Sequence, residues 1–188
     1  MPESLEQLKA LNVLLGVSGG IAAYKAADLA SKLTAAGAVV RTIMTDSACK
    51  LIAPATFEAV TGQPVYTSLW QGPEDFKIGH IQTADWADAA VVAPATANII
   101  ARLAHGIADD ALTCIALALN DRARTLVAPA MNGRMWLHQA TQQNVSELTR
   151  RSVEFIGPED GVLSCGYEGL GRLWPVEQIA QRVNALLG

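Results

Sequence analysis

Residues 11–33, LNVLLGVSGGIAAYKAADLASKL, limit the possible folds of this chain more narrowly than any other segment. Residues 11–17 are a short apolar run, Ser18-Gly19-Gly20 interrupts it, and residues 21–33 carry apolar side chains at helical spacing. This order predicts a strand, a tight glycine turn and a helix. The turn leaves backbone N–H groups without partners at a helix N-terminus, where an anion such as phosphate is favoured. The segment therefore predicts a site for a nucleotide-type cofactor.

The rest of the chain repeats the alternation of strand and helix. Apolar runs predict strands at 39–44, 88–93, 125–128 and 153–156, and helices are expected at 55–60, 96–105, 109–120, 132–151 and 175–187. Two stretches rich in glycine and proline, 62–79 and 157–171, are expected to be irregular, the first with room for a short strand at 65–67. The alternation predicts an α/β fold with a parallel sheet and helices on both faces.

The turns that follow the predicted strands are the expected ligand-binding segments. In parallel sheets, ligands bind beyond the carboxyl ends of the strands, where the strand order reverses. Residues 17–20, 45–47, 94–98 and 129–132 are therefore expected to meet on one rim of the sheet.

Composition excludes several classes of protein. The 188 residues suit one domain, 1–188, and the 51% hydrophobic content indicates strands buried on both faces or an oligomer. The net charge of −4, without a run of Lys or Arg, argues against nucleic-acid and membrane partners. Three separated cysteines fit neither a disulfide framework nor a metal site, and the polar N-terminus lacks the pattern of a signal peptide, so a cytoplasmic protein is expected.

The glycine turn has two other interpretations. Gly16-Val17-Ser18-Gly19-Gly20 matches G-x-S-x-G, the nucleophile elbow of α/β-hydrolases, although several strands precede the serine in that fold and only one does here. A tight turn that merely packs helix on strand is the other alternative. Neither the P-loop pattern nor G-x-G-x-x-G is present. Phosphate binding remains the favoured interpretation.

Four later residues have side chains that could contact a ligand or transfer a proton. Thr96 and Asn132 each follow a predicted strand and suit polar contacts with a ligand, but both also suit helix capping. His80, at the edge of the first irregular stretch, is a candidate base or a plain surface residue. Cys165, in the second, is a candidate proton donor or has no role.

These motifs together resemble the homo-oligomeric flavin-containing cysteine decarboxylases. The resemblance runs from about Leu11 to Pro175, and its most specific elements are APATAN at 93–98 and PAMNGRMW at 129–136, supported by VSGGIAAYK, MTDSA, GHI, WAD and SCGYEGLGR. It implies a Rossmann-like or flavodoxin-like parallel sheet, homotrimers or multiples of trimers, and FMN between subunits. Within the family, the presence of Cys165 in the glycine-rich flap SCGYEGLGR makes this chain resemble the phosphopantothenoylcysteine decarboxylases of coenzyme A biosynthesis more than the peptide decarboxylases.

The resemblance also implies roles for individual residues. The FMN phosphate end would be held by Gly19, Gly20, Ile21 and Thr45 with Ser18 and Ser47 close by, and the flavin lined by Thr96, Ala97, Asn98 and Ile99 with Ala130 nearby. Asn132 would bind the substrate carboxylate, with Met131 and Ser164 beside it. His80 would be the base. After loss of carbon dioxide the reduced flavin would return its electrons and Cys165 would supply a proton, giving 4′-phosphopantetheine.

Two departures keep other functions open. In the family, the glycine-rich flap that carries the cysteine usually reads Ala-Cys-Gly-Asp, whereas this chain has Ser164-Cys165-Gly166-Tyr167, with Tyr167 in place of the acid. Asp85 replaces a basic residue that family members often have before the Trp-Ala-Asp segment. A non-catalytic FMN-binding subunit or regulator, and a decarboxylase of a peptide C-terminal cysteine, are the alternatives. The synthetase domain that many bacterial members carry is expected to be a separate protein.

Overall fold

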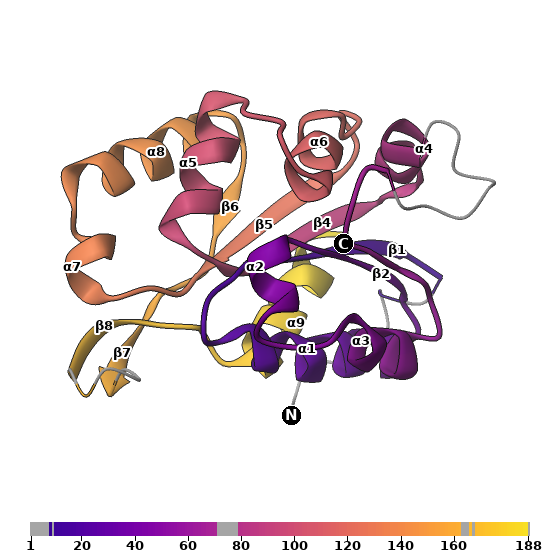
Figure 1. Cartoon of the computed structure of the whole chain (residues 1–188), viewed down its shortest axis with the longest axis horizontal. Helices are drawn as coiled ribbons and strands as arrows, with labels where there is room; N and C mark the ends of the chain where they lie inside the picture. Colours follow the sequence, from indigo (N-terminus) through magenta and orange to yellow (C-terminus); the bar gives the residue numbers. More distant parts are fainter. Residues whose placement is uncertain (1–7, 9, 71–78, 163–165, 167, 188) are drawn as a thin grey trace.

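Within residues 8, 10–70, 79–162, 166 and 168–187, which the computed structural model describes, six parallel strands form the central sheet (Figure 1). They are β1 (Asn12–Val17), β2 (Val39–Met44), β3 (Val65–Tyr66), β4 (Ala89–Ala95), β5 (Arg124–Pro129) and β6 (Glu154–Phe155). Their order, β3-β2-β1-β4-β5-β6, is that of the doubly wound Rossmann fold and reverses between β1 and β4. The predicted parallel α/β sheet is confirmed, with the Rossmann order.

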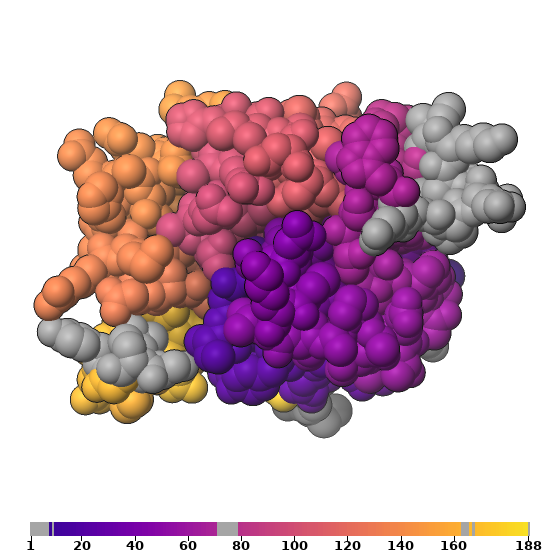
Figure 2. All heavy atoms as spheres, in the orientation of Figure 1, coloured from indigo at the N-terminus to yellow at the C-terminus, as the bar shows by residue number. Residues whose placement is uncertain are grey.

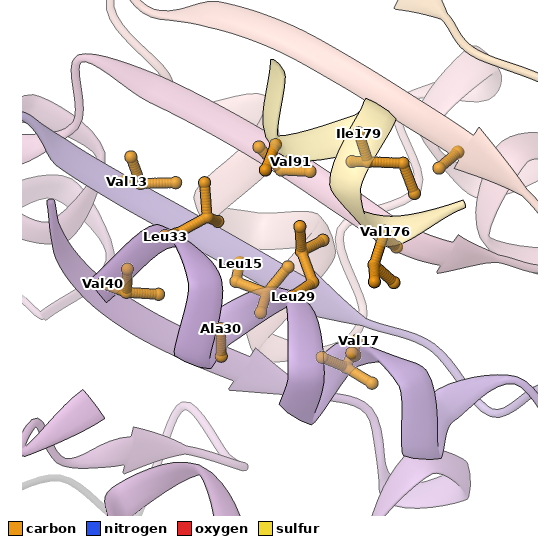
Figure 3. Packing of buried hydrophobic residues seen from close by; sticks show 14 of the residues in the cluster. Val13, Leu15, Val17, Leu29, Ala30, Leu33, Val40, Val91, Val176 and Ile179 are labelled. Atoms are coloured by element: carbon orange, nitrogen blue, oxygen red, sulfur yellow. The ribbon is translucent and has the colours of Figure 1, made fainter. Parts of the chain in front are cut away.

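Helices α1 (Ala23–Ala35), α3 (Pro54–Thr61) and α9 (Val176–Leu186) cover one face of the sheet. Side chains alternate along a strand, so Val13, Leu15 and Val17 of β1 all reach this face. Leu29 of α1 and Ile179 of α9 pack with them in one buried cluster (Figure 3). The cluster anchors α1, and with it the glycine turn that precedes this helix.

Helices α4 (Gly79–Trp86), α5 (Ala97–His105), α6 (Ala111–Leu117) and α8 (Gln139–Arg150) cover the other face. Leu14 of β1 and Val92 of β4 are buried there with Ile100 of α5 and Ile115 of α6. Burial on both faces accounts for the apolar strands. None of the helices in the described segments is long and apolar enough to cross a membrane.

Three helices begin at the rim formed by the carboxyl ends of the strands. Thr45 caps the short helix α2 (Asp46–Cys49) by accepting a hydrogen bond from the Ala48 N–H at 3.2 Å. Thr96 caps α5 in the same way, from the Ile99 N–H at 3.3 Å. Helix α1 begins at Ala23, two residues later than the apolar pattern predicts, because residues 21 and 22 belong to the turn.

Two local predictions, those for the surroundings of His80 and for residues 157–171, are wrong. Residues 79–86 form helix α4, so His80 lies in the first turn of a helix instead of at the edge of a loop. Segment 132–151 is mostly helical, as predicted, but it is divided into α7 (Gly133–Trp136) and α8, where His138 caps α8. The stretch 157–171, expected to be irregular, contributes the antiparallel pair β7 (Glu159–Val162) and β8 (Glu168–Arg172).

Candidate functional site

The glycine turn is held tightly against the other turns of the rim. A Cβ atom on Gly19 would lie 2.2 Å from the Ser47 Cβ, and one on Gly20 would lie 3.4 Å from the Thr96 Cγ2. Ala130, after β5, donates its N–H to the Ala95 carbonyl at 3.0 Å. The four turns therefore meet at the switch point of the sheet, as their positions after the strands predict.

Ser18 joins the ends of β1 and β4. It is 2% exposed, and its hydroxyl donates to the Pro94 carbonyl at 2.7 Å and accepts from the Thr96 N–H at 3.0 Å. A nucleophilic serine has to be exposed and hydrogen-bonded to a base. The buried, doubly bonded hydroxyl instead sets the spacing of the two turns, which argues against the hydrolase interpretation.

We expect Ser18→Ala to lower the free energy of unfolding by about 1–3 kcal/mol, because the buried Pro94 carbonyl would lose its hydroxyl donor and the partly buried Thr96 N–H its acceptor. The midpoint of urea unfolding measures this change. Ser47→Ala is the control, since Ser47 is exposed and keeps its Cβ; its effect should stay within about 0.5 kcal/mol. Equal stability of the two variants would contradict the proposed bracing role of Ser18.

An open cavity of about 710 Å³ lies beside the turn. Eight of the predicted site residues line it: Gly19, Gly20, Ile21, Thr96, Ala97, Ala130, Met131 and Asn132. Within the described chain, the N–H groups of Gly19, Ile21 and Ala22 donate to no protein acceptor. The cavity therefore combines unpaired backbone donors with apolar walls from residues such as Ile21, which is 62% exposed.

Five other predicted cofactor residues do not line the cavity. They are Ser18, Thr45, Ser47, Asn98 and Ile99. Thr45 caps α2, and Ser47 lies against Gly19, so both residues support the conformation of the glycine turn without lining the cavity. Ile99, on α5, is 1% exposed and belongs to the buried cluster between this helix and the sheet, whereas Asn98 is exposed.

The strand β8 closes one side of the cavity at the turn after β5. Gly171 accepts a hydrogen bond from the Met131 N–H at 3.0 Å, and a Cβ on Gly171 would lie 2.1 Å from the Met131 carbonyl oxygen. A Cβ on Gly133 would lie 2.6 Å from the Leu170 carbonyl oxygen. Two glycines thus allow the β7–β8 pair to pack directly on the turn that carries Asn132.

Asn132 is oriented by its own helix. Its Oδ1 accepts a hydrogen bond from the Arg134 N–H at 2.9 Å, which caps α7. Both expectations for this residue therefore apply at once, because it caps a helix and also lines the cavity. The cap sets the orientation of the amide at the cavity wall.

The remaining predicted site residues are His80, Ser164 and Cys165. His80 is exposed on α4 and does not line the cavity; α4 and α7 occupy opposite ends of the molecule (Figure 1). Figure 2 shows the same separation, with the α7 segment in orange and the α4 segment in magenta. Ser164 and Cys165 lie outside the described residues.

Sequence reasoning missed the residues at the other border of the cavity. Tyr24, Lys25, Met135, Val162 and Arg172 also line it. Lys25 and Arg172 stand within the segments VSGGIAAYK and SCGYEGLGR, but neither motif indicates by itself which side chains meet. A search for cations inside these two motifs would have found both.

Cys49 and Cys114 show no sign of reactivity. Burial raises the pKa of each thiol, and the carboxylates of Asp46 near Cys49 and of Asp110 and Asp109 near Cys114 raise it further. A raised thiol pKa lowers the thiolate fraction at neutral pH. Among the described residues, no group of three or more His, Cys, Asp or Glu side chains could hold a metal ion.

A glycine turn at the switch point of a Rossmann sheet, whose residues line a cavity and have unpaired N–H groups, defines a binding site for a phosphate-bearing cofactor. The chain belongs to the flavoprotein family, whose model matches residues 1–188. It is 51% identical over 170 residues to the coenzyme A biosynthesis bifunctional protein CoaBC of Bacillus subtilis, covering 90% of this chain and 41% of the relative. It is 44% identical over 181 residues to that of Vibrio cholerae, covering 96% and 45%. The chain thus spans less than half the length of these relatives.

Solved structures agree with this assignment. A PPC decarboxylase mutant complexed with pantothenoylaminoethenethiol matches with a TM-score of 0.83 and 30% identity, over 95% of this chain and 98% of the other. The FMN-dependent cysteine decarboxylase SpaF matches with a TM-score of 0.82 and 32% identity, over 96% and 98%. The resemblance to the flavin-containing cysteine decarboxylases is therefore confirmed.

Proposed function

We propose that this chain is an FMN-dependent decarboxylase that converts phosphopantothenoylcysteine to 4′-phosphopantetheine in the cytoplasm. The main support is the cavity that joins the glycine turn to Asn132, so that unpaired backbone N–H donors and a side-chain amide line one space. The similarity to the CoaBC proteins and to a PPC decarboxylase supports the same reaction.

The residues present fit FMN. The unpaired N–H groups of Gly19, Ile21 and Ala22 suit its phosphate, since they are concentrated at the start of α1. The exposed apolar surfaces of Ile21 and Met135 suit a flat ring. When bound, FMN would supply the two-electron oxidation of the substrate's cysteine side chain, which allows carbon dioxide to leave, and would then return the two electrons to the product.

The chain's own residues bind the substrate and move its protons. The Asn132 amide, held at the cavity wall by its helix-capping bond, orients the carboxylate that is lost. His80 takes the proton released as the cysteine side chain is oxidised. Cys165 donates the proton that accompanies return of the two electrons from the reduced cofactor to the unsaturated product, so that the saturated thiol leaves the site.

Joint action of His80 and Asn132 on one substrate requires more than one copy of the chain. His80 lies on α4 and does not line the cavity that contains Asn132, so a single copy does not bring these side chains together. We therefore propose a homotrimer, or a multiple of trimers, in which His80 of one copy reaches the cavity of its neighbour.

The purified protein should bind FMN and release carbon dioxide from phosphopantothenoylcysteine. Flavin absorbance measures the first property, and mass spectrometry of the product together with carbon dioxide release measures the second. An FMN-loaded protein that leaves this substrate unchanged would refute the proposed reaction. Conversion of a peptide with a C-terminal cysteine, or stable association with a second protein, would then favour one of the two alternatives.

We expect Cys165→Ser to retain decarboxylation but to accumulate an unsaturated product two mass units lighter, because the proton donor would be missing. Mass spectrometry of the reaction distinguishes the two products. Cys114→Ser is the matched control, because Cys114 is partly buried on α6 and lies outside the cavity. Normal formation of the saturated product by Cys165→Ser would contradict the proton-donor role.

A further inference from the structure

We propose that Lys25 and Arg172 bind the phosphate monoester of the substrate and thereby select a phosphorylated substrate over an unphosphorylated one. This inference rests on the proposed decarboxylase function and names a substrate-recognition site within it. The two cations come from different parts of the chain, since Lys25 belongs to α1 and Arg172 to β8.

Both side chains stand on the border between two hollows. The cavity that contains Asn132 adjoins a second hollow of about 370 Å³, and the border shared by the two is lined by Tyr24, Lys25, Arg172 and Leu173. Gly19, Gly20 and Thr96 line only the first hollow. A ligand that begins at Asn132 and extends away from the cofactor turn therefore meets the two cations.

The β7–β8 pair holds the Arg172 side chain in place. A Cβ on Gly161 would lie 2.6 Å from the Arg172 Nη1, so the absence of a side chain in β7 makes room for the guanidinium. The Glu159 carboxylate lies 3.8 Å from the Arg172 Nη2, at the long end of the range for an ion pair. Arg172 therefore keeps most of its hydrogen-bonding capacity for a ligand.

Lys25 is left without a carboxylate partner in the described part of the chain. Asp28 and Glu177 line the second hollow, but the Lys32 ammonium lies 3.2 Å from each of them. These two ion pairs raise the pKa of Lys32 and leave Lys25 as an uncompensated charge at the border. An unpaired lysine and an arginine at one opening suit a dianionic phosphate.

The phosphate group of FMN is the other phosphate monoester that Lys25 and Arg172 could bind. It is already provided for at the turn, where the N–H groups of Gly19, Ile21 and Ala22 donate to no acceptor in the described chain, and none of these three residues lines the second hollow. The substrate's phosphate has no other cation among the residues that line the first cavity. We therefore assign the cationic border to the substrate.

The test measures substrate discrimination in Lys25→Met, Arg172→Gln and Arg172→Lys. For the first two, kcat/KM with phosphopantothenoylcysteine should fall by about 10–100-fold, the value of a charged hydrogen bond, and Arg172→Lys should lose less. With pantothenoylcysteine the change should stay below about threefold, because no phosphate is present. Lys50→Met is the control, as Lys50 is exposed and lines neither hollow.

Titration of each apoprotein with FMN separates the two phosphates. Unchanged FMN affinity supports the inference, whereas a loss of FMN affinity assigns the cations to the cofactor and overturns it. Equal losses with both substrates overturn it too. If the wild-type protein turns over neither substrate, the proposed function fails; calorimetric binding of phosphopantothenate and pantothenate to the FMN-loaded protein then still tests the phosphate preference.

Discussion

Gly19→Ala is expected to give a protein that no longer retains FMN. The added Cβ would lie 2.2 Å from the Ser47 Cβ and 2.9 Å from the Ser47 carbonyl carbon, so the turn and the start of α2 must separate. Overpacking of this kind costs about 1–3 kcal/mol and displaces the N–H groups that face the cavity. We expect at least about a tenfold weaker FMN affinity, measured by fluorescence titration, with a lower melting temperature.

Gly20→Ala is the comparison for stability. Its Cβ would make only an ordinary contact, 3.4 Å from the Thr96 Cγ2, so its melting temperature should stay near that of the wild type. The double variant Gly19→Ala/Ser47→Gly should recover part of the lost FMN affinity, because the closest clash is removed. An FMN-replete Gly19→Ala protein of normal stability would contradict the role of this turn.

His80→Gln and Asn132→Ser are each expected to lose decarboxylase activity by at least about a hundredfold, the usual contribution of a general base or of an orienting group. Serine keeps the helix cap at position 132, so α7 should persist without the amide. Co-expression of the two variants should restore about a quarter of the wild-type activity, since random assembly leaves that share of sites with both groups.

The restored activity distinguishes a shared site from a site within one copy. His80 and Asn132 lie on elements at opposite ends of the molecule, so only a neighbour can unite them (Figure 1). Co-expression of His80→Gln with His80→Ala is the control and should restore nothing. Absence of recovery in mixed oligomers that carry both His80→Gln and Asn132→Ser chains would contradict the shared site.

The elements predicted correctly are those whose signals are local. Strand β2 was predicted at its observed bounds because its sequence, VVRTIM, is rich in β-branched and apolar residues, and β1 was predicted to within one residue. Helix α4 was missed because its buried residues are only Thr83 and Ala84, and the Asn120 Nδ2 reaches the Ala84 carbonyl at 3.1 Å from a distant part of the chain. Such a helix depends on tertiary packing more than on its own pattern.

By itself, the sequence determined the α/β class, the anion-binding turn and the resemblance to a flavin-dependent family. Hydrophobic periodicity and short motifs depend only on residues that are close together in the chain. Only the tertiary structure decided the Rossmann strand order, the bracing role of Ser18 and the separation of His80 from Asn132. It alone brought Lys25 of α1 beside Arg172 of β8. Contacts between distant segments arise from how sheet and helices pack, and no local pattern of residues specifies them.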